Sequence, residues 1–236
     1  MLLGAPSATR ASVNIGVAVV VAPPPLPVYE QPLIPGPGYI WTPGYWAWGP
    51  DGYFWVPGTW VLAPFPGALW TPGYWAWDND DYFWNEGFWG PEVGFYGGID
   101  YGFGYTGYGY YGGYWSNGTF FYNTVVNNVR TTSITNVYNK SVVNTTMTHV
   151  SFNGGPGGIN ARPTATEMAA AKLRHGPPTS TQRQQLQIAR HDRGQFASVN
   201  HGAPAVAATP KPGAFSGPRV VRASRAGGPV SVAANH

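Results

Sequence analysis

Tryptophan, with its large flat indole ring, is the residue type on which this chain could build a binding function. Eleven tryptophans occur, and eight of them stand in four copies of the pattern Trp-x-x-Gly-x-Trp. Flat aromatic rings stack on one another and on flat apolar partners such as sugar rings, so a row of indoles could be a core or an exposed platform. The residues expected on this face are Trp41, Gly44, Trp46, Trp48, Trp55, Gly58, Trp60, Trp70, Gly73, Trp75, Trp77, Trp84, Gly87 and Trp89.

The even spacing of the four copies identifies them as an internal repeat. Their first tryptophans stand at positions 41, 55, 70 and 84, so the steps are 14, 15 and 14 residues. The octapeptide at 41–48 recurs unchanged at 70–77. A double unit of 29 residues has therefore been duplicated.

Each copy of the pattern predicts a short hairpin. Pro-Gly is a turn signal, because proline presets φ at the first central position and glycine supplies the positive φ of the second. A loop over 42–45 would place Trp41 opposite Trp46, and a turn over 49–52 would place Trp46 opposite Trp55. Continued through the later copies, this pairing gives an antiparallel meander of eight short strands with eight tryptophans in one row.

Both faces of such a sheet carry aromatic rings. The side chains of a strand alternate between its two faces, so rings at neighbouring positions point to opposite faces. A single sheet cannot bury both faces, and cover from residues 13–21 or 120–152 is expected unless the tryptophan row is an exposed platform. The rings expected on the second face are Tyr45, Phe54, Tyr74 and Phe83.

Glycine-rich and acidic patterns elsewhere have simpler explanations than ligand chemistry. Residues 102–107 and 107–112 match G-x-G-x-x-G, but a dinucleotide loop needs a preceding strand and a following helix, and neither is expected there. The acidic stretch at 78–81 lacks the alternating oxygen ligands of a calcium loop and aligns with the turn at 49–52.

Histidines and paired carboxylates also form no catalytic or metal-binding pattern. No two histidines stand at H-x-x-x-H spacing, and the carboxylates are better explained as turn residues. We therefore expect no catalytic residue, no metal site and no cofactor. The residues weighed are His149, His175, His191, His201, His236, Asp51, Asp80, Asp81 and Glu86.

The composition excludes several classes of protein. Of the 236 residues only 10% are charged, against roughly 25% in a typical domain. Glycine has no period of three, which excludes collagen, and no run approaches 18 apolar residues, so no transmembrane helix is expected. Cysteine is absent, which excludes disulfides and thiol catalysis.

The net charge of +3 conceals a strong asymmetry. Residues 1–120 hold one basic and eight acidic residues, a balance of −7, whereas residues 121–236 hold twelve basic and two acidic residues, a balance of +10. Such a split predicts two segments with different partners, or two segments that attract each other. The basic residues form no dense cluster and no recognised nucleic-acid module, so a nucleic-acid partner is disfavoured.

Capping boxes predict two short helices. Thr164 with Glu167 and Thr179 with Gln182 each place a hydroxyl residue three positions before an acidic or amide side chain. The second helix should run to Arg193 and be ended by Gly194. These helices are the only ones expected in a chain that is otherwise mainly β, a tryptophan-rich antiparallel meander of short hairpins with disordered Pro/Gly-rich tails.

Composition divides the chain into seven segments. Residues 1–11 read as the remnant of an export signal, because an apolar start is followed by small residues at the −3 and −1 positions before Ser12. A full signal would begin further upstream. The other segments are a strand plus Pro-rich arm over 12–37, the four repeats over 38–92, a Gly/Tyr-rich tract over 93–119, a Val/Thr/Asn-rich β segment over 120–155, two short helices within 156–202 and a basic disordered tail over 203–236.

The repeats, the lead-in at 22–32 and the stretch at 90–99 resemble the bacterial YXWGXW (also WXXGXW) repeat exported proteins. The stretches at 150–155 and 196–202 are similar to longer members, so the resemblance covers about residues 13–215. Members are secreted or envelope proteins of Gram-negative bacteria. The resemblance implies export to the periplasm, the outer-membrane surface or the medium, and it implies no activity and no catalytic residue.

These observations favour a non-enzymatic, exported cell-envelope protein with a structural or adhesive role. A carbohydrate-binding module that uses the Trp/Tyr face is the second hypothesis, and a cytoplasmic nucleic-acid-associated Gly/Tyr-rich protein is the third. Expected partners are a polysaccharide, another envelope component or a second copy of the chain. The compartment separates the third hypothesis from the others, and a glycan-binding assay separates the first two.

Overall fold

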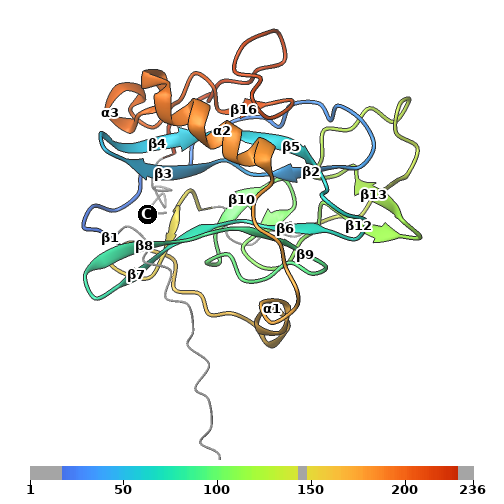
Figure 1. The fold of residues 1–236 in the computed structure, drawn as a ribbon, viewed down its shortest axis with the longest axis horizontal. Coiled ribbons are helices and arrows are strands. Elements are labelled where there is room, and N and C mark those ends of the chain that lie inside the picture. The colour runs from blue at the N-terminus through green and yellow to red at the C-terminus, as the bar shows by residue number, and fades with distance from the viewer. Residues whose placement is uncertain (1–17, 143–147, 228–236) are drawn as a thin grey trace, which may run out of the picture.

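The structure is a computed structural model that describes residues 18–142 and 148–227. Two long hairpins formed by the repeats lie in two layers, with helices α2 and α3 over the outer side of one layer and α1 below the other (Figure 1). The expected class, mainly β with short antiparallel hairpins and few helices, is confirmed. None of the helices in the described ranges has the length and apolar character needed to cross a bilayer.

The first double repeat forms one long hairpin with a single register. Strand β2 (Tyr39–Thr42) pairs with β5 (Gly58–Leu62), and β3 (Tyr45–Gly49) pairs with β4 (Gly52–Val56). In this register Trp41 lies opposite Trp60 and Trp46 lies opposite Trp55.

The second double repeat folds in the same way. Strand β6 (Leu69–Thr71) pairs with β9 (Phe88–Gly90), and β7 (Tyr74–Asp78) pairs with β8 (Asp81–Asn85). The turn between β7 and β8 has positive φ at both of its central residues, 48° and 68°, which suits Asn and Asp. The duplication seen in the sequence is therefore a duplication of a whole hairpin.

The expected pairing of Trp41 with Trp46 is wrong. Trp46 does face Trp55, as predicted, but Trp41 faces Trp60, so the eight tryptophans do not form one row across a meander. Pro43 and Gly44 make no turn, and the chain continues in an extended path from β2 to β3. Proline lacks an N–H group, so the dipeptide interrupts the ladder without reversing it.

The glycine of each repeat makes room for a tryptophan of the other copy. A Cβ on Gly44 would lie 2.3 Å from Cζ2 of Trp55, and a Cβ on Gly58 would lie 2.6 Å from Cζ2 of Trp41. The second hairpin repeats this arrangement, with the corresponding distances of 2.4 and 2.5 Å at Gly73 and Gly87. Two copies of the pattern thus fit each other across one hairpin.

The facing indoles form four edge-to-face or tilted pairs. Their ring centroids lie 5.2–5.5 Å apart, and their planes meet at 53–67°. Aromatic rings prefer such arrangements, which add to the free energy gained by burying them. The pairs are Trp41–Trp60, Trp46–Trp55, Trp70–Trp89 and Trp75–Trp84.

The Gly/Tyr-rich tract is part of the core. It forms β10 (Asp100–Gly102), β11 (Tyr105–Thr106) and β12 (Gly113–Ser116), and it buries large rings beneath the repeats. The hydroxyl of Tyr105 lies 2.9 Å from the carbonyl oxygen of Trp70 and 3.3 Å from that of Trp41. Because these two tryptophans are equivalent in the duplication, Tyr105 joins the two hairpins at matching positions.

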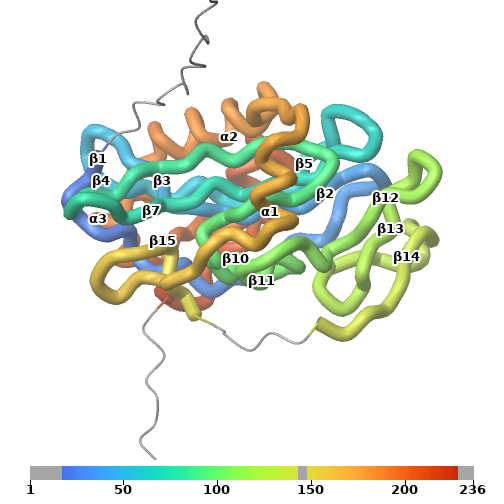
Figure 2. Tube along the Cα trace, turned by 90° about the horizontal axis from the view of Figure 1, so that it is seen from below, coloured from blue at the N-terminus to red at the C-terminus, as the bar shows by residue number. Residues whose placement is uncertain are grey.

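Short strands complete the sheets. Strand β13 (Thr119–Asn123) lies between β12 and β14 (Val137–Tyr138) at one end of the molecule (Figure 2). Strands β1 (Ala18–Val19) and β15 (Phe152–Asn153) flank the second hairpin in the order β1-β8-β7-β15. Both strands pair at the edges of this hairpin, so they widen its sheet and are not the expected cover over a face.

The first hairpin receives its cover from helices instead. Helix α2 (Ser180–His191) and α3 (Ala197–Asn200) follow α1 (Ala165–Ala170), with the 3₁₀-helix η1 (Arg193–Gln195) between α2 and α3. Both predicted capping boxes are present. The side chains that pack between α2, the α3 region and the outer face of the hairpin are Phe54, Val56, Ala189 and Phe196.

The prediction of a disordered tail from residue 203 is wrong for residues 203–227. Strand β16 (Ala208–Thr209) pairs with β5 in parallel, and its residues are fully buried. The indole N–H of Trp55 donates to the carbonyl oxygen of Ala207 at 2.9 Å. Small side chains let this backbone approach the sheet closely. Residues 1–17 and 228–236, with the export-signal remnant and the end of the tail, lie outside the described ranges.

We expect Gly44→Ala to lower the free energy of unfolding by about 1–3 kcal/mol, because its Cβ would overlap the ring of Trp55 and the backbone of Gly58. Gly36→Ala is the control, since nothing lies within 4 Å of a Cβ there. Its effect should stay within about 0.5 kcal/mol. Urea unfolding measures both. Equal losses of stability in the two variants would contradict the close packing of Gly44 against Trp55.

Trp46→Ala should cost about 3–5 kcal/mol of stability, as for other large-to-small aromatic truncations in a core. It should also remove the exciton signal that Trp46 and Trp55 give in circular dichroism, because their centroids lie 5.2 Å apart. Trp77→Ala is the control, since Trp77 is partly buried and outside the four pairs. If the two variants behave alike in both measurements, the pairing is incorrect.

Candidate ligand-binding groove

The repeat tryptophans are core residues in this structure. Seven of the eight are at most 7% exposed, and only Trp84 is partly buried. Trp48 and Trp77, which extend the predicted face, are also partly buried. The row therefore offers no broad exposed platform, and the self-packed interpretation is the one that the structure supports.

Indole N–H groups attach distant segments to this core. Trp46 and Trp60 donate to the carbonyl oxygens of Pro25 and Pro32 in the Pro-rich arm, at 3.1 and 2.8 Å. Trp75 donates to the carbonyl oxygen of Trp46 at 2.8 Å, which joins the two hairpins. A buried N–H needs a partner, so these bonds fix which backbone segment lies beside each ring.

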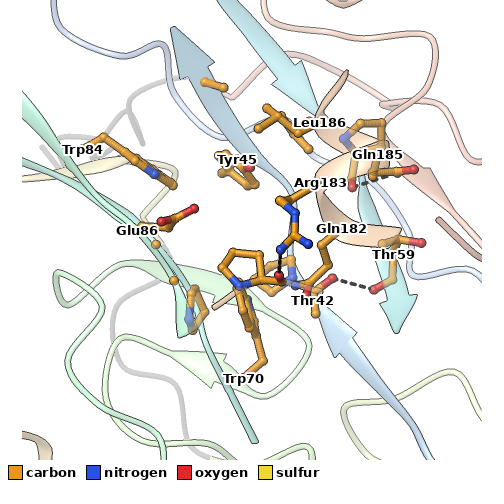
Figure 3. Close-up of a pocket in the computed structure, with 18 of the residues that line it drawn as sticks. Thr42, Tyr45, Thr59, Trp70, Trp84, Glu86, Gln182, Arg183, Gln185 and Leu186 are labelled. Atoms are coloured by element: carbon orange, nitrogen blue, oxygen red, sulfur yellow. Dashed lines mark hydrogen bonds between the residues drawn. The ribbon is translucent and has the colours of Figure 1, made fainter. Parts of the chain in front are cut away.

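A groove of about 260 Å³ opens between the two hairpins and helix α2. Side chains of both hairpins and of α2, from Gln182 to Arg190, line it (Figure 3). Most of the lining is apolar or aromatic. The residues that matter for its chemistry are Thr42, Tyr45, Val56, Trp70, Trp84, Glu86, Tyr101, Gln182, Arg183, Leu186 and Arg190.

The aromatic wall of the groove is a stacked pair from different hairpins. The rings of Tyr45 and Trp84 have centroids 4.8 Å apart and an interplanar angle of 18°. Both rings are partly exposed, unlike the paired indoles of the core. Leu186 from α2 lies across from them (Figure 3). Each ring covers one face of the other, so the aromatic surface that solvent can reach lies on their edges and outer faces.

Polar groups line the groove on two opposite sides. Glu86 lies beside Trp84 on the second hairpin, and Gln182 and Arg183 come from α2 (Figure 3). Glu86 and Arg183 are exposed. Arg183 donates one hydrogen bond to the carbonyl oxygen of Pro178, which leaves most of its five N–H donors for other partners.

Among the described residues, the side-chain amide of Gln182 has an oxygen that is engaged in the fold and an N–H₂ group that is not. Its Oε1 accepts the indole N–H of Trp89 at 2.8 Å and the backbone N–H of Thr179 at 2.8 Å. The amide oxygen is therefore engaged and its orientation fixed. Within the described ranges no protein acceptor takes the amide N–H₂ group, so this donor can serve a ligand.

Burial raises the pKa of the phenols in and under the groove well above the usual value near 10. The pKa of Tyr45 is raised by burial and further by the carboxylate of Glu86. The pKa of Tyr101 is raised by burial first and then by neighbouring phenols, and its hydroxyl donates to the carbonyl oxygen of Gly73 at 2.6 Å. At neutral pH both phenols are protonated, and the hydroxyl of Tyr101 is already engaged by the carbonyl oxygen of Gly73.

The groove thus combines apolar and aromatic walls with exposed polar groups. The described residues include no group of three His, Cys, Asp or Glu that could hold a metal ion. Sequence reasoning placed Tyr45 on a second face and Glu86 among turn carboxylates, but it did not bring them together. It missed Gln182 and Arg183, because no local pattern reveals which hairpin a helix will cover.

Alkaline pH should unfold the protein cooperatively. The buried phenols of Tyr96 and Tyr105 have a pKa raised well above 10 in the folded chain, mainly by burial. The unfolded chain loses these protons first, so the stability they contribute is complete below about pH 10 and falls as pH rises, by about 1.4 kcal/mol per pH unit for each phenol. Phenolate absorbance and near-ultraviolet circular dichroism should change together.

Tyr105→Phe should make this fall with pH shallower by about 1.4 kcal/mol per pH unit, whatever its effect at neutral pH. Tyr108→Phe, which changes an exposed ring, is the control and should leave the slope unchanged. Gradual phenol ionisation in a chain that stays folded would contradict the burial of these rings.

Comparison with known proteins agrees with the repeat structure. Residues 36–61 and 67–89 match the WXXGXW repeat as two copies, and each match lies on one of the two hairpins. No curated protein and no solved structure matches the chain. The unit that the family describes therefore corresponds to one double repeat folded as one hairpin, and residues 36–89 carry two copies of the WXXGXW repeat.

Proposed function

We propose that this chain is a non-enzymatic protein of the cell envelope, exported from the cytoplasm and structural or adhesive in role. The observation that carries the proposal is the burial of the repeat tryptophans. Their rings pair across the hairpins, and their N–H groups attach the arm and the C-terminal segment. The repeats thus build a rigid scaffold, as a structural or adhesive protein requires.

The chemistry of the core suits an exported protein. The chain has no cysteine, so its stability does not depend on the redox state of the compartment. The low content of charged residues and the dense aromatic packing give a fold held mainly by apolar burial. The resemblance of the sequence to exported repeat proteins and the small residues before Ser12 support export further.

The groove supports the adhesive form of this role. It is an open, largely apolar site with a few polar groups directed into it, as binding sites for small ligands usually are. The phenol of Tyr45 is protonated at neutral pH, so its hydroxyl can donate a hydrogen bond to a ligand.

Cell fractionation tests this proposal. The gene, with its upstream region and a tag after His236, is expressed in a Gram-negative host. We expect the protein in the periplasm, the outer membrane or the medium, with its N-terminus cleaved. A control without the upstream region and residues 1–17 should stay in the cytoplasm. Recovery of the uncleaved full-length product from the cytoplasm would overturn the proposal and favour the nucleic-acid-associated alternative.

A further inference from the structure

We propose that the groove between the hairpins and α2 binds one ring of a neutral saccharide, with Tyr45 and Trp84 as the stacking wall and Glu86, Gln182 and Arg183 as hydrogen-bond partners. This inference names a ligand class for the proposed adhesive role. It rests on that role only for its biological meaning, since the binding itself is argued from the groove. It also moves sugar recognition away from the repeat tryptophans as a set, because most of them are buried.

The walls of the groove call for a ligand with apolar faces. Tyr45 and Trp84 offer partly exposed aromatic surface, and Leu186 and Val56 add aliphatic surface around it. A pyranose ring carries C–H groups on its faces, which can lie against aromatic rings while its hydroxyl groups point outward. Covering this apolar surface gives the favourable free energy of contact.

The polar groups call for a ligand that both donates and accepts hydrogen bonds. The carboxylate of Glu86 only accepts, whereas the guanidinium of Arg183 and the amide N–H₂ of Gln182 only donate. They stand on opposite sides of the groove (Figure 3). A sugar hydroxyl does both, so one polyol ring can satisfy an acceptor on one side and donors on the other.

The mixed charge disfavours strongly charged ligands. An anion would approach Glu86, and a cation would approach Arg183 and Arg190, so each would meet repulsion as well as attraction. A zwitterionic amino acid avoids this repulsion. However, Glu86 and Arg183 are exposed, and ion pairs at exposed positions contribute little. Stacking and hydrogen bonds to a neutral ring use more of the groove.

The size of the groove limits the ligand to about one ring. Its volume of about 260 Å³ is smaller than the ~300–1,000 Å³ of pockets for drug-sized ligands. Binding of one such ring should therefore be weak, with a Kd of about 1 mM, and a polysaccharide would gain strength from many copies of the protein on one surface.

The test is binding of purified protein to glucose, galactose, mannose and N-acetylglucosamine, followed by saturation-transfer NMR and by calorimetry. L-Phenylalanine and inorganic phosphate are the comparison ligands. We expect at least one neutral sugar to saturate with a Kd of about 1 mM, with little change when salt is raised, because no net charge is neutralised. If none of the four sugars saturates, the proposal is wrong.

Matched variants locate the site. Glu86→Gln should weaken sugar binding by about tenfold or more, because hydrogen bonds to a charged group are the strong ones, and Arg183→Gln should act similarly. The controls are Glu92→Gln and Arg193→Gln, which change exposed residues outside the groove and should bind like the parent. Tyr45→Phe keeps the stacked ring and should lose only a few-fold in affinity.

The melting temperature of every variant must match that of the parent, so that loss of binding reports the site and not the fold. Equal binding by Glu86→Gln and Glu92→Gln would overturn the proposal. So would tighter binding of phenylalanine than of every sugar, which would make the groove an amino-acid site. These measurements use purified protein, so they stay separate from export: an envelope protein that binds no sugar contradicts this inference alone.

Discussion

Contact between the edge of an indole ring and the bare backbone of a glycine holds each hairpin in register, and the other features of the fold follow from it. The glycine of one copy accepts the first tryptophan of the other, as Gly44 does for Trp55 and Gly58 for Trp41. Neither copy can complete this contact alone, so the structural unit is the double repeat of 29 residues. A slip of the register would bring side chains against the rings, which explains why strands this short pair uniquely.

The same rings decide how the rest of the chain folds. Burying an indole removes its N–H from water, and most of these donors find an acceptor, although the N–H of Trp41 has none among the described residues. Two of the acceptors are backbone carbonyl groups of segments that have little side chain of their own, Pro32 in the arm and Ala207 near the C-terminus. Segments whose composition favours disorder are therefore held in extended form on the core, because their backbones satisfy groups that the repeats leave unpaired.

Local chemistry was sufficient to predict much of this fold. Capping boxes such as Thr179 with Gln182 begin helices because both partners lie within one turn, and the turns at 49–52 and 78–81 reverse the chain as expected. The Pro43-Gly44 dipeptide was misread because a missing N–H and a missing side chain suit a turn and an interrupted ladder equally well. Long-range packing was beyond local patterns: α2 covers Phe54 more than a hundred residues earlier in the chain.

The charge asymmetry of the sequence takes a specific form in the groove. The acidic first half and the basic second half were expected to have different partners or to attract each other. The structure brings them to one site, with Glu86 on a hairpin and Arg183 and Arg190 on α2. Within the described ranges no ion pair involves Glu86, so the opposite charges face an open space and do not neutralise each other in direct contact. Aromatic packing fixes the walls, and this arrangement leaves an acceptor and several donors exposed at fixed positions, which is the condition for selective binding of a small polar ring.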